Sequence, residues 1–183
     1  MEPGIYDATV NKLGEGPLWH PGRQELFWID ILNEVLYCRH GEEIRHWQFD
    51  QPISATAWID QDSLLIASAS ALLKFDIASG LTEVVAPLEA DNPLTRSNDG
   101  RADTQGGFWI GTMARDHAAR AGAIYRYYRG ELRKLYTEIT VPNAMCFSPD
   151  GDFAYFADSM RQKIMRQRLD PADGWPSGDP EVF

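Results

Sequence analysis

Three short segments carry residue types that bind sugars and hard metal ions. Glu15 lies between two glycines, and Asn143 directly follows a proline. Between them in the chain, Arg96 and Asn98 stand two positions apart in an Arg-Ser-Asn-Asp-Gly run. Carboxylate and amide oxygens are ligands for hard divalent cations, whereas guanidinium and amide groups donate to carbonyl and hydroxyl oxygens. The segments predict a polar site on a β-scaffold for a small, oxygen-rich ligand.

Each segment also has a plainer interpretation. On an extended strand Arg96 and Asn98 fall on the same side and can share a ligand, but Arg96 could instead form a surface ion pair with Asp99. Glu15 could be a solvated loop glutamate, and Asn143 could bond its own backbone. The residues alone leave these alternatives open.

Composition narrows the class of partner. The chain has 183 residues, 44% of them hydrophobic and 24% charged, which suits one folded domain with a sizeable core. Its net charge of −10 opposes binding to nucleic acid or to anionic membranes. The start lacks the pattern of a secretory signal, and no apolar run approaches a membrane span. We therefore expect a cytoplasmic protein, with protein partners undetermined.

An apolar strand centre recurs four times along the chain. The four centres begin at positions 27, 64, 108 and 155, with steps of 37, 44 and 47 residues. A turn rich in Asp, Gly or Pro precedes each centre, and a second strand of roughly alternating pattern follows it, at 35–40, 72–77, 124–128 and 164–169. This period is typical of a four-stranded propeller blade of about 40–50 residues.

Further strands at 44–49, 82–86 and 132–136 close three of the units, and no helical periodicity is evident. The pattern predicts an all-β fold in which residues 1–183 form a single β-propeller domain of about four blades. Two distant cysteines, Cys38 and Cys146, fit reduced core thiols better than a disulfide or a zinc site.

Together, Leu-Gly-Glu15-Gly-Pro-Leu-Trp, the Arg96 to Gly100 run with Phe-Trp-Ile-Gly-Thr-Met, and Val-Pro-Asn143-Ala-Met resemble the senescence-marker-protein/gluconolactonase family, the regucalcin-like lactonases. The resemblance covers nearly the whole chain. It implies a six-bladed β-propeller, of which this chain would be the incomplete N-terminal portion, about the first four blades. Phe183 falls where a fifth blade would begin, so we expect the chain alone to be inactive and prone to aggregation.

The resemblance also implies roles for individual residues. Glu15 and Asn143 match metal ligands, with Ala144 after the asparagine where the family typically has glycine. Arg96 and Asn98 match substrate-binding residues, and Asp116 stands where the family has a substrate-contacting glutamate. The catalytic acid/base aspartate, which is also a metal ligand, is expected beyond the end of this chain; Asp158 instead resembles a strand-end aspartate that caps a turn.

The implied activity is metal-dependent hydrolysis of a sugar-acid lactone to the aldonic acid, a step of carbohydrate metabolism, with one divalent ion (Ca, Zn, Mn, Mg or Fe). The substrate partner would be a small sugar lactone. A non-catalytic propeller that binds calcium or a small ligand is the alternative, and a protein-interaction propeller of the WD or kelch type is a third. No His-Glu-x-x-His or Gly-x-Ser-x-Gly motif occurs, which disfavours a histidine-bound zinc ion and a serine nucleophile.

Overall fold

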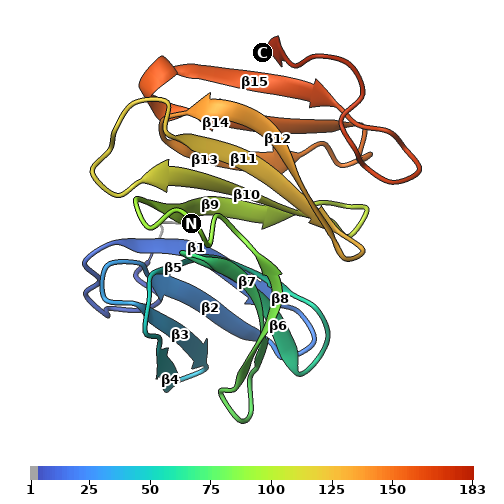
Figure 1. Cartoon of the computed structure of the whole chain (residues 1–183). Helices are drawn as coiled ribbons and strands as arrows, with labels where there is room; N and C mark the ends of the chain where they lie inside the picture. The colour runs from blue at the N-terminus through green and yellow to red at the C-terminus, as the bar shows by residue number, and fades with distance from the viewer. Residues whose placement is uncertain (1–3) are drawn as a thin grey trace.

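The computed structural model describes residues 4–183 as an all-β protein built from four antiparallel sheets of four strands each (Figure 1). Strand order within each sheet follows chain order, so every sheet is a simple meander. The all-β class and the four propeller blades predicted from the sequence are confirmed. Within the described residues the single helical segment is a 3-10 turn, η1, at Ser159–Arg161, and no helix is long and apolar enough to cross a membrane.

Blade 1 consists of β1 Gly14–His20, β2 Glu25–Asp30, β3 Val35–His40 and β4 Glu43–Gln48. Blade 2 consists of β5 Ile53–Trp58, β6 Ser63–Ser68, β7 Ala71–Asp76 and β8 Thr82–Pro87. Blade 3 consists of β9 Thr95–Ala102, β10 Phe108–Ala114, β11 Gly122–Tyr128 and β12 Glu131–Ile139. Blade 4 consists of β13 Pro142–Phe147, β14 Phe153–Asp158, β15 Lys163–Arg168 and β16 Glu181–Val182.

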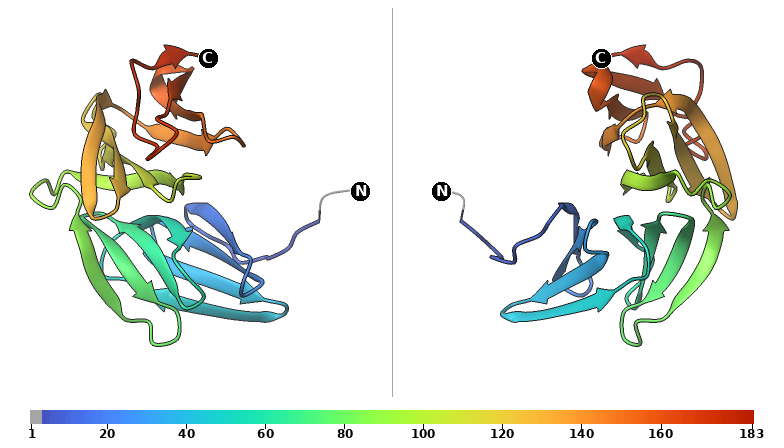
Figure 2. Two further views of the ribbon diagram at one scale, coloured as in Figure 1. Left: turned by 90° about the vertical axis from the view of Figure 1, so that its right-hand side faces the viewer. Right: turned by 60° about the vertical axis from the view of Figure 1, so that its left-hand side comes forward.

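The blades follow one another along an arc, with blade 1 and blade 4 at its two ends (Figure 2). The first strand of each blade lies innermost, and successive innermost strands contact one another, β1 with β5, β5 with β9 and β9 with β13. Side chains at the start of these four strands are therefore brought together from positions far apart in the sequence.

The hydrophobic core lies between the blades rather than within one sheet. Three clusters of buried side chains occupy the three junctions between neighbouring blades. Strand β6 shows how this works, because Leu64 and Ile66 pack toward blade 1 whereas Leu65 and Ala67 pack toward blade 3. A strand covered on both faces is apolar at consecutive positions, and this explains the apolar centres of β6 and β10 in the sequence.

A fully buried ion pair joins the turn between β9 and β10 to strand β11 in blade 3. Arg126 Nε lies 2.6 Å from Asp103 Oδ2, and both side chains are inaccessible to solvent. The same carboxylate accepts hydrogen bonds from Trp109 Nε1 at 3.1 Å and from the Gly107 amide at 2.7 Å. These donors offset the cost of removing the carboxylate from water.

Two details of the sequence interpretation were wrong. Cys38 is buried, but Cys146 on β13 is exposed, so only Cys38 is a core thiol; neither forms a disulfide. The glycines beside Glu15 and the proline before Asn143 indicate turns, but both segments belong to strands, β1 and β13. Blade 4 also has an outer strand that the sequence pattern did not indicate, the two-residue β16.

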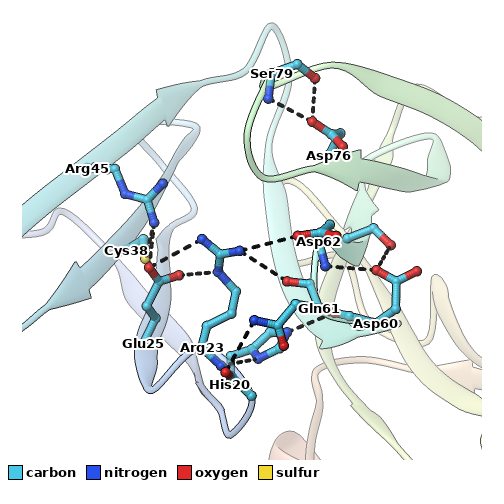
Figure 3. A network of polar contacts seen from close by, with 12 residues as sticks. His20, Arg23, Glu25, Cys38, Arg45, Asp60, Gln61, Asp62, Asp76 and Ser79 are labelled. Atoms are coloured by element: carbon cyan, nitrogen blue, oxygen red, sulfur yellow. Dashed lines mark hydrogen bonds and ion pairs between the residues drawn. The ribbon is translucent and has the colours of Figure 1, made fainter.

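Blades 1 and 2 are joined by a polar network at their hairpin ends (Figure 3). Glu25 accepts hydrogen bonds from Arg23 Nε at 2.6 Å and from Arg45 Nη2 at 2.8 Å. Burial alone would raise the pKa of Glu25, but these two arginines hold it below its usual value. Buried His20 bonds through Nε2 to the Asp60 carbonyl at 2.9 Å, so this histidine is structural.

Candidate functional site

Each innermost strand carries a β-bulge near its start. The register shifts fall between Glu15 and Leu18 in β1, between Ile53 and Ala55 in β5, between Ser97 and Gly100 in β9, and between Asn143 and Cys146 in β13. A bulge interrupts regular pairing and re-aims nearby side chains, and bulges are frequent beside active sites. Glu15, Asn98 and Asn143 all lie at or next to these bulges.

The backbone at two bulges is left-handed. Gly16 has φ +58°, and Ala144, at the corresponding place after Asn143, has φ +61°. Glycine adopts this conformation freely, whereas a side chain with a Cβ is strained in it. Gly16 therefore meets the requirement of its bulge without strain, whereas Ala144 accepts local strain.

Four polar side chains from two blades form a continuous hydrogen-bonded row. Arg96 Nη1 donates to Asn98 Oδ1 at 3.0 Å, and Asn98 Nδ2 donates to Asn143 Oδ1 at 3.1 Å. Asn143 Nδ2 in turn donates to Ser159 Oγ at 2.8 Å. The row joins a predicted substrate-binding pair to a predicted metal ligand.

Arg96 is the charged residue of this row. Its side chain is buried, with the residue 8% exposed, and it forms no ion pair within residues 4–183. Burial, and then the nearby charge of Arg115, lower the pKa of its guanidinium, while the carboxylate of Glu15 acts in the opposite direction. A poorly solvated cation without a carboxylate partner favours a ligand oxygen that carries negative charge.

The side chain of Glu15 on β1 is exposed, and within residues 4–183 its carboxylate accepts no hydrogen bond. Its carboxylate is therefore available to a ligand. Across the same residues no group of three or more His, Cys, Asp or Glu side chains could hold a metal ion. Glu15 and the Asn143 carbonyl oxygen fit a hard cation by donor type, but they supply two ligands only.

Two buried aspartates, at the ends of β2 and β14, bind the backbone just before β1 and just before β13. Asp30 accepts from the amides of Lys12 at 2.8 Å and Leu13 at 3.0 Å, just before Glu15. Asp158 accepts from the amides of Thr140 at 3.0 Å and Val141 at 3.1 Å, just before Asn143. Asp158 also caps η1, as expected from the sequence. The same device thus fixes the backbone ahead of each predicted metal ligand.

Two plainer interpretations of the site residues are wrong. Arg96 does not pair with Asp99, whose Oδ2 accepts from the Met145 amide at 3.2 Å. Asn143 bonds the side chains of Asn98 and Ser159 and not its own backbone.

Asp116 lies apart from the row, on an exposed loop after β10, where Oδ1 accepts from the Ala118 amide at 3.0 Å. Its role as a substrate contact remains a prediction. Ser159 was not recognised as a site residue from the sequence. Its position directly after the strand-end Asp158, which pairs with Pro142, is the signal that could have placed it beside Asn143.

Two hollows lie elsewhere. One, of about 410 Å³, is lined by the paired side chains of the network between blades 1 and 2. The other, of about 650 Å³, is a largely apolar cleft between β12 and blade 4. Neither is lined by Glu15, Arg96, Asn98 or Asn143, so neither hollow is the candidate site.

Comparison with known proteins identifies the family. Residues 13–183 match the model of the SMP-30/gluconolactonase/LRE-like region. The chain belongs to this family. A Rhizobium meliloti (strain 1021) protein provisionally named sugar lactone lactonase is 43% identical over 177 residues, which are 96% of this chain and 60% of that protein. The L-arabinolactonase of Azospirillum brasilense is 34% identical over 164 residues, 85% of this chain and 54% of that enzyme.

Among solved structures, a calcium-binding protein, regucalcin, from Agrobacterium tumefaciens superimposes with a TM-score of 0.95 at 40% identity. The match covers 97% of this chain and 61% of that one. The chain therefore spans 54–61% of the length of these relatives. These matches establish the family and the similarity of this chain to proteins named as lactonases.

Proposed function

We propose that the whole protein is a metal-dependent lactonase that hydrolyses a sugar-acid lactone to the open aldonic acid. The observation that carries this proposal is the row from Arg96 through Asn98 to Asn143, with Glu15 acting on Arg96 from a third blade. The row supplies oxygen ligands and oxygen-binding donors side by side, as cleavage of a polarised ester requires.

Arg96 and Asn98 would bind and orient the lactone. Within the described residues, Arg96 Nη1 donates to the Ser97 carbonyl at 2.7 Å and to Asn98 Oδ1. The remaining N–H groups of Arg96 are left for substrate oxygens. Asn98 Nδ2 is anchored by the Pro142 carbonyl at 2.9 Å, so its amide is held in place before substrate arrives. The remaining N–H groups of Arg96 are the donors that would stabilise negative charge as it develops on the lactone oxygen, while Asn98 offers the second lone pair of Oδ1 to a sugar hydroxyl.

Glu15 and Asn143 would hold the metal ion, which can be Ca²⁺, Zn²⁺, Mn²⁺, Mg²⁺ or Fe²⁺, because oxygen ligands discriminate weakly among them. A divalent cation bound there supplies Lewis acidity toward the lactone carbonyl. By resemblance to the family, we infer that the whole protein closes into six blades. An aspartate of a later blade would then complete the ligand set and transfer the proton.

The test is lactone hydrolysis by the whole protein on a panel of five- and six-carbon aldonolactones, with and without EDTA. Activity should be lost with EDTA and return with a divalent ion. Glu15→Gln should lose most activity at every substrate concentration, whereas Glu42→Gln, at an exposed hairpin glutamate, should not change it. Full activity of Glu15→Gln in EDTA would refute the proposal.

The alternative function is a non-catalytic propeller that binds calcium or a small ligand, and its support is the similarity to the calcium-binding regucalcin. The two functions share Glu15 and Asn143 but differ in turnover. Ca²⁺ binding that depends on Glu15, combined with no hydrolysis of any lactone in the panel, would favour the alternative.

A further inference from the structure

Ser159 forms a hydrogen bond with Asn143, the predicted metal ligand on β13, although Ser159 itself lies outside that strand. It is an exposed residue in the turn η1, directly after β14, and its Oγ accepts from Asn143 Nδ2 at 2.8 Å. Asp158 fixes this turn, because its carboxylate accepts from the Met160 amide at 3.2 Å and from amides that precede β13. The hydroxyl of Ser159 is thus held in a defined place relative to Asn143.

The orientation of the two asparagine amides follows from Arg96. A guanidinium can only donate, so the atom of Asn98 that faces Arg96 is Oδ1. The Asn98 amide nitrogen then faces the Pro142 carbonyl and Asn143, and Asn143 must present Oδ1 to it. The amide nitrogen of Asn143 then lies on the opposite side, where it donates to Ser159 Oγ.

We propose that Ser159 is a positioning residue that locks the amide of Asn143 with Oδ1 toward Arg96 and Asn98. The proposal rests on the proposed function, in which Oδ1 of Asn143 is a metal ligand. A carbonyl oxygen has two lone pairs, and Asn98 uses one of them, so the second stays available to a cation. Within residues 4–183, the contact from Asn98 would be the one hydrogen bond left to restrain the orientation of the amide without Ser159.

Outer partners of metal ligands commonly tune metal affinity by orienting the ligand. Ser159 differs from a core residue in that it is exposed, so its hydroxyl can be removed without opening a cavity or leaving a buried polar group unpaired. An effect of its substitution on Asn143 can therefore be separated from an effect on folding.

The experiment compares Ser159→Ala with Ser159→Thr, which keeps the hydroxyl. The matched control is Ser79→Ala, which removes an exposed serine that bonds Asp76 at 2.6 Å in the distant β7–β8 hairpin. Two quantities are measured in the whole protein: the exchange with water of the Asn143 side-chain amide protons by ¹H–¹⁵N NMR, and the Kd for Mn²⁺ by calorimetry.

In Ser159→Ala the Asn143 amide protons should exchange faster and the Kd for Mn²⁺ should rise about tenfold or more. Ser159→Thr and Ser79→Ala should match the unsubstituted protein in both measurements. Unchanged amide exchange in Ser159→Ala would overturn the positioning role. Absence of Mn²⁺ binding by the unsubstituted protein would instead overturn the metal site of the proposed function, while faster amide exchange in Ser159→Ala would still support the positioning role.

Discussion

Replacement of Ala144 by glycine should stabilise the protein, because Ala144 holds a left-handed backbone at the bulge of β13. The strain on an L-residue in this conformation is about 1–2 kcal/mol. Glycine is also freer than alanine in the unfolded chain, which lowers the unfolding free energy by about 0.5–1 kcal/mol and offsets part of this gain. Ala144 is exposed, so the lost methyl group removes little buried surface. The net change in unfolding free energy is a gain of about 0.5–1 kcal/mol.

Urea-induced unfolding followed by tryptophan fluorescence measures this change. The midpoint should move to higher urea with an unchanged slope, since the surface exposed on unfolding stays the same. The mirror experiment is Gly16→Ala, at φ +58°, where an added Cβ would lie 3.1 Å from the Ser54 carbonyl oxygen. That variant should lose about 1 kcal/mol or more. A lower midpoint for Ala144→Gly, or no loss for Gly16→Ala, would show that the bulge backbone is not strained as described.

Three further predictions concern charge and burial. Asp103→Ala should cost about 3–5 kcal/mol of unfolding free energy, because it leaves the buried Arg126 without its partner; a loss below 1 kcal/mol in urea titration would contradict this. Burial alone would raise the pKa of Asp30, but its hydrogen bonds, first from the Lys12 and Leu13 amides, hold it below the usual 3.8. The stability it adds is therefore present above about pH 4 and lost as pH falls further, so Asp30→Asn should be less stable at pH 7 and show a shallower acid decline. Burial raises the pKa of Cys38 to about 12, so a thiol reagent at pH 8 should modify exposed Cys146 quickly and Cys38 only on unfolding, with Cys146→Ser as the control.

The strand centres could be predicted from the sequence because each is a run of apolar residues, and in β6 and β10, which lie between two blades, both faces of the strand are covered. The innermost strands could not, since their bulges interrupt the alternating pattern. Glycine and proline around Glu15 and the proline before Asn143 are typical of turns, although here they lie within strands β1 and β13.

The pairing of Arg96 with Asn98 followed from their spacing along one strand. The contact between Asn98 and Asn143 depends instead on how β9 and β13 of neighbouring blades approach each other, and this was not evident from local pattern. Ser159 depends on the register of the β13–β14 hairpin, in which Pro142 pairs with Asp158. Contacts set by packing between blades are therefore the part of the site that required the structure.

The bulges separate the chemistry of this protein from its stability. Glu15, Asn98 and Asn143 lie at interruptions of strand pairing, whereas the apolar side chains that hold the blades together lie in the regular parts of the sheets. Blades 1, 3 and 4 thus each contribute a side chain to the site that can be exchanged without repacking its neighbours. A scaffold of this kind can change its ligand set one residue at a time, so related propellers can diverge in substrate while every intermediate sequence still folds.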